Sequence, residues 1–320
     1  MSYQRLGIGI VVAGLCWAAD SPARPGEPAP DATGEYRIRA NVDRVVLPVT
    51  VVDRKGGLVA GLAQADFAVY EDGRPQHIRS FFYRDTPVTV GLVVDGSSSM
   101  ESKRGNAMLA ALHFLKLSNP ADELFVVNFN EKVSFGLPES APFTGDPVSL
   151  RDALLAFPSR GRTALYDAVA AALRRLAGGS RDKKALVVVS DGGDNASKRT
   201  FRQLLDAVQR SEAIVYTIGL LDEEAPDHDL RVLKKLARST GGEVFLPRTA
   251  AELPAICAHI AGVLRSQYTI GYAPANENHD GAYRRIEVVA TAPGSSRRLV
   301  VRTRSGYYAP LDQPPAKALQ

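Results

Sequence analysis

The feature that most constrains the fold is an alternation of short apolar runs and amphipathic segments between residues 87 and 266. Uninterrupted apolar runs are typical of strands that are covered on both faces of a mostly parallel sheet. They lie at residues 88–94, 124–129, 185–190, 213–220 and 243–246. Apolar residues with helical spacing follow within 107–115, 165–176, 201–208 and 230–237. The alternation predicts an α/β fold with a doubly wound, mostly parallel sheet.

Strand patterns without helices precede this region. Residues 45–52 are a β-branched run in which Pro48 indicates an edge strand or a bulge. Residues 66–73 and 77–83 alternate apolar and polar side chains on either side of a turn at Asp72-Gly73, which predicts a hairpin.

Strand patterns also follow the α/β region, at residues 267–273, 283–290 and 298–304. Neither β segment alone has enough strands for an independent domain. We therefore expect the two segments to pair into one β-sandwich, with the α/β domain inserted into it.

The N-terminus has the pattern of a secretory signal peptide. Arg5 precedes the apolar run 6–17, and the small residues Ala18-Ala19 follow it. Because a membrane span needs about 20 apolar residues, we expect no transmembrane span in the mature chain. Export to the periplasm or beyond the cell is the first interpretation. Lipid anchoring at Cys16 is the second, since Leu15 stands where lipoprotein signals normally carry a small residue, and an uncleaved anchor is the third.

These patterns divide the chain into six parts. We expect a signal peptide (1–19), a disordered leader (20–34), an N-terminal β segment (35–86), the α/β domain (87–266), a C-terminal β segment (267–310) and a tail (311–320). After signal cleavage Cys257 is alone, and its apolar neighbours predict a buried structural thiol. Nothing in the sequence predicts an oligomeric state.

The charge balance argues against a nucleic-acid partner. The net charge of +4 arises from 39 basic and 35 acidic residues, and the basic residues are scattered along the chain. Nucleic-acid binding normally requires a clustered basic face.

Oxygen-bearing side chains gather after three predicted strands or loops. The stretch VVDGSSSM places Asp95, Ser97 and Ser99 at a strand end, Asp191 follows a second strand, and Thr163 begins a helix. In a doubly wound sheet, ligands bind beyond the carboxyl ends of the strands, where these loops can converge. Five oxygen ligands without sulfur or imidazole suit Mg²⁺ best, with Mn²⁺ or Ca²⁺ as alternatives.

Four neighbouring residues are expected to shape these loops or to support the ligands from behind. Gly96 lets the backbone turn, and Ser98, Asp194 and Asn195 lie beside the ligand candidates. Asp167, one turn into its helix, is expected to favour the helix dipole. The five histidines share no spacing typical of metal ligands.

The motif DGSSS resembles the D-x-S-x-S motif of the von Willebrand factor A domain, with Thr163 and Asp191 in the expected order. The resemblance covers roughly residues 87–266 and implies a metal-ion-dependent adhesion site. It implies that Ser97 and Ser99 bind the ion directly, that Thr163 does so when the partner is bound, and that Asp95 and Asp191 act largely through water. The partner protein would offer an Asp or Glu carboxylate to the open position.

The flanking segments extend this likeness over roughly residues 35–310. DFAVYEDG, YTIGYAP, DGAYRRIEV and RSGYYAP resemble strands of the bacterial secreted VWFA-related domain family, and GRTALYDAV and SDGGDNAS resemble its central loops. We therefore expect an exported protein-binding module with Mg²⁺, and no enzyme.

Three other interpretations stay open at this point. The serines can cap the following helix, because its first N–H groups need oxygen acceptors. The protein can be an envelope scaffold whose metal site is structural or empty. A metal-assisted hydrolase is a weaker alternative, since such sites usually carry more carboxylates or histidines. A serine nucleophile is disfavoured, because the G-x-S-x-G elbow is missing and no histidine stands out as its base.

Overall fold

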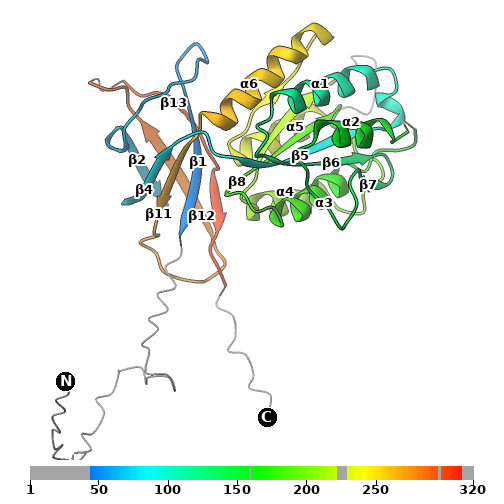
Figure 1. Ribbon diagram of the computed structural model, residues 1–320. Helices are drawn as coiled ribbons and strands as arrows, with labels where there is room; N and C mark the ends of the chain where they lie inside the picture. The colour runs from blue at the N-terminus through cyan, green and yellow to red at the C-terminus, as the bar shows by residue number, and fades with distance from the viewer. Residues whose placement is uncertain (1–43, 159, 222–228, 295–296, 312–320) are drawn as a thin grey trace, which may run out of the picture. The chain divides into compact units, whose positions relative to one another are not determined.

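A six-stranded sheet with strand order β10-β9-β8-β5-β6-β7 forms the centre of the α/β region (Figure 1). The computed structural model describes residues 44–158, 160–221, 229–294 and 297–311. The strands are β5 (Val88–Asp95), β6 (Glu123–Phe129), β7 (Val133–Phe135), β8 (Lys183–Ser190), β9 (Ile214–Gly219) and β10 (Val244–Phe245). All neighbouring pairs are parallel except β6 and β7. The predicted α/β character is therefore confirmed.

Helices cover both faces of this sheet. On one face α1 (Arg104–Leu117), α2 (Pro147–Leu155) and α6 (Leu253–Arg265) share a buried apolar cluster with the strands. On the other face α3 (Leu165–Ala177), α4 (Phe201–Arg210) and α5 (Leu230–Thr240) do the same. Short 3-10 turns are η1 (Gln64–Asp66), η2 (Ser98–Met100) and η3 (Ala250–Glu252). Figure 1 shows α1 and α6 on one side of the sheet and α3 and α4 on the other.

Two four-stranded antiparallel sheets combine strands from the two ends of the chain. One has the order β13-β1-β11-β4, with β1 (Val45–Val52), β4 (Ile78–Tyr83), β11 (Tyr268–Tyr272) and β13 (Val300–Arg302). The other has the order β14-β12-β2-β3, with β2 (Phe67–Glu71), β3 (Arg74–Gln76), β12 (Tyr283–Ala290) and β14 (Gly306–Tyr308). Side chains of both sheets belong to one apolar cluster, which includes Leu47, Val69, Tyr268 and Val288.

The predicted hairpin between residues 66–73 and 77–83 is wrong in its second strand. β2 pairs with the shorter strand β3, and the turn has positive φ at Asp72 (49°) and Gly73 (78°), as a two-residue hairpin turn requires. The chain then leaves this sheet at His77, and β4 joins the other sheet beside β11. Periodicity predicted the strands but not this change of sheet.

Pro48 does not lie in an edge strand, because β1 has β11 on one side and β13 on the other. Pro48 pairs in regular register with Thr269 of β11, so it does not form a bulge. On the other side, β13 pairs only with residues 50–52 of β1. The missing N–H of Pro48 therefore interrupts no ladder.

None of the helices in the described ranges has the length and apolar content that a membrane span requires. Cys257 lies fully buried in α6, as predicted, and its thiol contacts the carbonyl oxygen of Ala110 at 3.2 Å. Burial raises the pKa of this thiol to about 11, which makes it unreactive at neutral pH. The signal segment (1–19) and the leader (20–34) lie outside the described residues, and so does the tail predicted at residues 311–320 apart from Leu311.

Candidate metal-binding site

Three loops at the carboxyl edge of the central sheet carry the predicted site residues. Asp95 ends β5, and Asp191 directly follows β8. These strands are parallel neighbours, with Val94 opposite Val189, so the two aspartates emerge side by side. The third loop, residues 160–164, leads into α3 and carries Thr163.

Backbone hydrogen bonds tie the loop before α3 to the serine loop. The Ser98 N–H donates to the Gly161 carbonyl oxygen at 3.0 Å, and the Gly161 N–H donates to Ser98 Oγ at 2.9 Å. Gly161 has φ +89°, a backbone conformation that residues with a side chain rarely adopt, and a Cβ there would also displace the end of the Glu131 side chain. The residue must therefore be glycine for this connection to form.

A second pair of hydrogen bonds ties the same loop to the residues after β8. The Thr163 N–H donates to Asn195 Oδ1 at 2.9 Å, and the Asn195 N–H donates to the Thr163 carbonyl oxygen at 2.9 Å. Nearby, Asp194 Oδ2 accepts from the Tyr166 N–H at 2.9 Å and from Ser197 Oγ at 2.6 Å. Asn195 and Asp194 thus organise the loops by hydrogen bonding.

Four of the five ligand candidates are almost inaccessible to solvent. The exposed fractions are 2% for Asp95, 1% for Ser97, 5% for Thr163 and 1% for Asp191. Ser99 is half-buried, and its Oγ lies 3.2 Å from Ser97 Oγ. The structure therefore brings all five residues to one edge of the sheet, in loops that are bonded to one another.

The carboxylates of Asp95 and Asp191 differ in how many of their oxygens accept a hydrogen bond. Asp95 accepts from the Ser97 N–H at 2.9 Å and from Ser190 Oγ at 2.6 Å, so both of its oxygens are bonded. Asp191 Oδ1 accepts from the Gly193 N–H at 3.0 Å. Its other oxygen, Oδ2, is buried and has no hydrogen-bond partner within the described part of the chain. An orphaned buried carboxylate oxygen is costly unless a cation or a donor reaches it.

Without a bound cation, the two buried carboxylates of the site are electrostatically unfavourable. Burial raises the pKa of Asp95 to about 6, and the nearby Asp191 carboxylate adds to this effect. Hydrogen bonds from Ser190 and Ser97 oppose it. The donor set of two carboxylates and three hydroxyls, with one carboxylate oxygen unpartnered, fits a hard divalent cation. No group of three or more His, Cys, Asp or Glu side chains with metal-binding geometry occurs in the described ranges, so this chain offers no richer acidic site there.

The capping interpretation of the serines is wrong. Helix α1 begins only at Arg104, and its N-cap Lys103 makes no side-chain cap bond. Ser97 precedes the short turn η2, and its side chain does not cap that turn. The hydroxyls of Ser97 and Ser99 are therefore not used to satisfy the N-terminus of a helix.

Gly96, Asp167 and Ser190 play parts that the sequence alone described incompletely. A Cβ at Gly96 would meet the Phe157 ring at 2.9 Å, so close packing also requires this glycine. Asp167 accepts from the Lys198 N–H at 2.8 Å and pairs with Arg199, which holds the segment after Asn195 in addition to any effect on the helix dipole. Ser190 was not predicted, and its part follows from the hydrogen bond that its Oγ donates to Asp95.

Comparisons with known proteins agree with this fold. Residues 90–193 match the family model of the von Willebrand factor type A domain. The solved structure of a von Willebrand factor type A protein from Catenulispora acidiphila is similar over 85% of this chain and 75% of its own, with 15% identity and a TM-score of 0.50.

Two further structures match a smaller part of the chain. BatB, a conserved hypothetical protein from Bacteroides thetaiotaomicron, is 18% identical over 56% of this chain and all of its own, with a TM-score of 0.43. The von Willebrand domain of the type V pili tip protein Mfa5 from Porphyromonas gingivalis is 15% identical over 57% of this chain and 96% of its own, with a TM-score of 0.47. No curated protein sequence matches the chain. The family match and the observed sheet order together identify a von Willebrand factor type A domain in this protein.

Proposed function

We propose that the protein is a metal-dependent protein-binding module of the adhesion type. Ser97, Ser99 and Thr163 would hold Mg²⁺ through their hydroxyls, and Asp95 and Asp191 through their carboxylates or intervening water. When bound, Mg²⁺ supplies a Lewis-acidic position that accepts a further oxygen ligand. Mn²⁺ and Ca²⁺ are the alternatives that this donor set allows.

The observation that carries this proposal is the unpartnered oxygen of Asp191. It lies buried beside a second carboxylate whose pKa burial has raised, and no hydrogen-bond donor reaches it in the described residues. A divalent cation would neutralise both carboxylates at once. Without a bound cation, this buried oxygen would remain unsatisfied.

The donor set also supports a negatively charged partner. If Asp95 and Asp191 act largely through water, the ligands in direct contact with the ion are neutral hydroxyls and water, which leaves the divalent cation without a directly bound anion. An Asp or Glu side chain from a partner protein would therefore bind as a short, charged contact in place of a water molecule. The exposed loop residues around the site, such as Ser98 and Asn195, would then contact the partner directly.

A catalytic role has less support. The described site contains two carboxylates, and a hydrolase would need a further base or a second ion that this donor set does not supply. A scaffold with a structural metal uses the same residues, and it differs from the proposed module only in that no carboxylate of a partner reaches the ion.

The context of the domain forms a second part of the proposal. We propose that residues 87–266 form the binding domain, and that residues 35–86 and 267–310 form a β-sandwich beside it. The apolar cluster that both four-stranded sheets share supports the sandwich. Arg5 and the apolar run 6–17 support export to the periplasm or the cell exterior, with acylation at Cys16 as the alternative.

The test uses Mn²⁺ as a paramagnetic substitute for Mg²⁺. Water-proton relaxation should rise when Mn²⁺ binds the metal-stripped chain, because bound ions tumble slowly. A short peptide that contains one Glu should lower this enhancement, since its carboxylate displaces a water molecule from the ion, and the same peptide with Gln should not. Enhancement that neither peptide changes would support the structural-metal alternative and contradict the binding function.

A further inference from the structure

We propose that a second site, distant in sequence from the metal loops, binds an acidic monosaccharide, that is, a pyranose ring that carries a carboxylate. The site is a cavity of about 160 Å³ beside the two four-stranded sheets. Its walls come from the start of β1, the α4–β9 connection, the β11–β12 connection and the segment 304–310. The residues used below are Arg44, Glu212, Asn276, Asn278, Arg304 and Tyr308.

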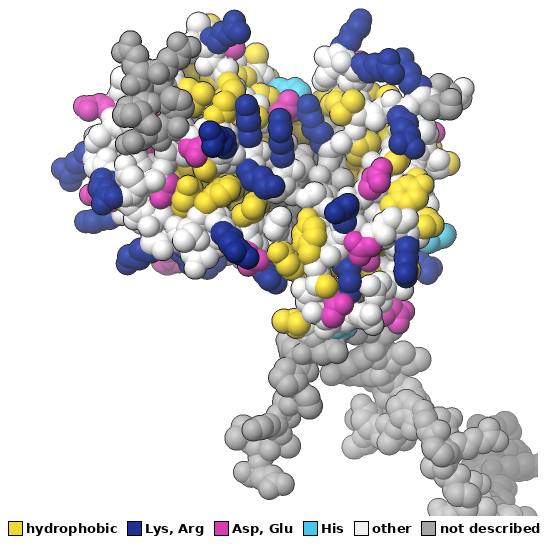
Figure 2. Space-filling model, turned by 180° about the vertical axis from the view of Figure 1, so that it is seen from behind, with side chains coloured by type: hydrophobic (Ala, Val, Ile, Leu, Met, Phe, Trp, Pro, Cys, Tyr) yellow, Lys and Arg dark blue, Asp and Glu magenta, His cyan; other side chains and the backbone are white. Residues whose placement is uncertain are grey.

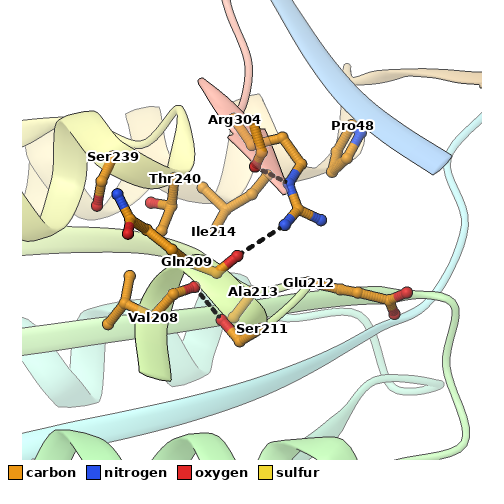
Figure 3. A pocket seen from close by; sticks show the side chains of 11 residues that line it. Pro48, Val208, Gln209, Ser211, Glu212, Ala213, Ile214, Ser239, Thr240 and Arg304 are labelled. Carbon is orange, nitrogen blue, oxygen red and sulfur yellow. Dashed lines mark hydrogen bonds between the residues drawn. The ribbon is translucent and has the colours of Figure 1, made fainter. Parts of the chain in front are cut away.

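Arg304 presents one free guanidinium nitrogen. Its Nε donates to the Gly306 carbonyl oxygen at 2.9 Å, and Nη2 donates to the Gln209 carbonyl oxygen at 2.9 Å. These bonds fix the planar group, and the remaining terminal nitrogen has no partner among the described residues and points away from Gln209 (Figure 3). The group is therefore positioned in advance, with a donor left for a ligand.

Glu212 lies close enough to Arg304 for an electrostatic interaction, but its carboxylate makes no direct contact with that guanidinium group. It forms no ion pair within the described ranges, and its side chain extends away from Arg304 (Figure 3). Arg44, which also lines the cavity, is exposed and likewise forms no ion pair in those ranges. Two guanidinium groups and one carboxylate thus line the cavity, with a net charge of +1 among them.

The β11–β12 connection adds two amides. Asn276 Oδ1 accepts from the Asn278 N–H at 3.2 Å, which leaves the Asn276 NH₂ group available. The side-chain amide of Asn278 makes no hydrogen bond within the part of the chain that the structure describes. Amides both donate and accept, as sugar hydroxyl groups do, so they suit a polyhydroxylated ligand.

Tyr308 forms the aromatic wall of the cavity, and neighbouring side chains hold its ring in place. The Arg210 guanidinium lies over the Tyr308 ring at 4.1 Å from its centroid, and Tyr283 contacts the ring edge-on at a centroid distance of 5.2 Å. Tyr307, the neighbouring residue in the lining, is also fixed, because its hydroxyl and that of Tyr272 donate to the buried Glu71 carboxylate at 3.0 and 2.8 Å. The wall can therefore pack against the C–H face of a ring without losing side-chain entropy.

Size and chemistry together select the ligand class. A cavity of about 150 Å³ holds a six-membered ring, so a nucleotide is too large. The polar lining disfavours an acyl chain. A free phosphate would leave the amides and the aromatic wall unused. Because the cavity has one more guanidinium group than carboxylates, it suits a ligand with a carboxylate. The planar Arg44 group can bind that carboxylate through two parallel hydrogen bonds, and Arg304 can add one further donor.

The experiment is a titration of the ¹⁵N-labelled full chain with D-glucuronate, with D-glucose and acetate as comparisons. A ligand of this size at about 0.3 kcal/mol per non-hydrogen atom has an expected dissociation constant of about 1 mM. Amide shifts should be confined to residues 274–278 and 304–310. D-glucose should bind roughly tenfold more weakly, because it lacks the carboxylate.

Two variants and a matched control localise the binding. Arg44→Gln should lower the affinity for D-glucuronate to that for D-glucose, and Asn278→Ala should weaken both sugars. Arg54→Gln, an exposed arginine in the turn after β1, should change neither. Melting temperatures equal to wild type would show that the variants are folded.

The proposal is overturned if D-glucuronate gives no saturable shifts at about 20 mM, if acetate binds as tightly as D-glucuronate, or if Arg44→Gln and Asn278→Ala bind both sugars like wild type. None of these results depends on Mg²⁺, so the proposed metal-dependent function is tested separately.

Discussion

Asp95 carries its carboxylate at a position that water hardly reaches, and this has a measurable cost. Its pKa in the folded chain is about 6, whereas the unfolded value is 3.8. The folded state therefore holds the proton more tightly. The stability associated with Asp95 is complete below pH 3.8 and is lost as the pH rises through about 6.

We predict that the metal-free chain loses about 2 kcal/mol of unfolding free energy from this one group between pH 4 and pH 7. Asp95→Asn should remove that loss, so the variant should be more stable than wild type at pH 7 and nearly equal to it at pH 4. Urea unfolding at both pH values measures this. An equal pH dependence in the two proteins would show that Asp95 is not the destabilising group.

Thr163 is the residue whose role separates partner binding from metal binding. Its hydroxyl makes no hydrogen bond in the described ranges, whereas its backbone is tied to Asn195. We predict that Thr163→Ala weakens the binding of a Glu-containing peptide to the Mn²⁺-loaded chain more than it weakens Mn²⁺ binding, and that Thr163→Ser restores both. The opposite ranking for Thr163→Ala would contradict the role that we assign to this residue.

Most residues of the candidate site could be predicted from the sequence, because their loops follow recognisable strands or precede a recognisable helix. These residues are Asp95, Ser97, Ser99, Thr163 and Asp191. Ser190 escaped prediction, since a serine at a strand end has no distinctive pattern until its partner, Asp95, is known. The unpartnered oxygen of Asp191 also follows only from three-dimensional contacts.

The loop of residues 160–164 is the element on which the site depends. Its backbone is bonded to Ser98 on one side and to Asn195 on the other. Elements of this kind are short and irregular, so their conformation is determined by tertiary contacts rather than by local propensity. The sequence predicted the location of the loop but not the bonds that hold it.

We predict that Asn195→Ala lowers the free energy of unfolding by about 1–3 kcal/mol, because the Thr163 N–H loses its acceptor. Mg²⁺ affinity should fall at least tenfold, since Thr163 and its neighbours lose their fixed position. Thermal unfolding with and without Mg²⁺ measures both effects. Ala196→Gly, at the neighbouring position in the same loop, is the control for a general loosening of the backbone. Equal Mg²⁺ affinities in Asn195→Ala and Ala196→Gly would argue against a specific role for Asn195.

Other elements show where sequence patterns fail. Strand β7 has three residues, too few for a periodic signal. Helix α2 was not predicted, although it has local helix features, namely Asp146 as its N-cap, Pro147 in its first turn and the buried residues Leu150 and Leu154. β2 and β4 were assigned to one hairpin because nothing in the sequence near His77 marks the change of sheet.

The α/β region and the four-stranded sheets are joined by the C-terminal segment 302–306. Arg302 pairs with Glu243, which precedes β10, and Arg304 donates to the end of α4. Thr303 Oγ1 donates to the Pro48 carbonyl oxygen of β1 at 2.9 Å. Since these contacts involve separate elements of the fold, we expect a single cooperative unfolding transition.

Gly241 tests this connection. It ends α5 with φ +81°, and a Cβ there would lie 2.4 Å from the Thr303 carbonyl carbon, which is backbone and cannot move aside. We predict that Gly241→Ala lowers the free energy of unfolding by about 2 kcal/mol or more. Gly262→Ala in α6, where a Cβ meets nothing within 4 Å, should raise it by about 0.5–1 kcal/mol. Calorimetry of both variants checks the contrast, and equal effects would show that the segment does not pack against α5 as described.

The most direct measurement is a calorimetric titration of Mg²⁺ into the metal-stripped chain at pH 7.5, with Asp95→Ala and Asp191→Asn alongside. Asp152→Asn, an exposed aspartate of α2, is the matched control. We predict saturable one-site binding in the wild type and the control, and its loss in both site variants while they remain folded. Binding that survives in Asp95→Ala and Asp191→Asn, or no binding by the folded wild type, would contradict a metal site at these loops.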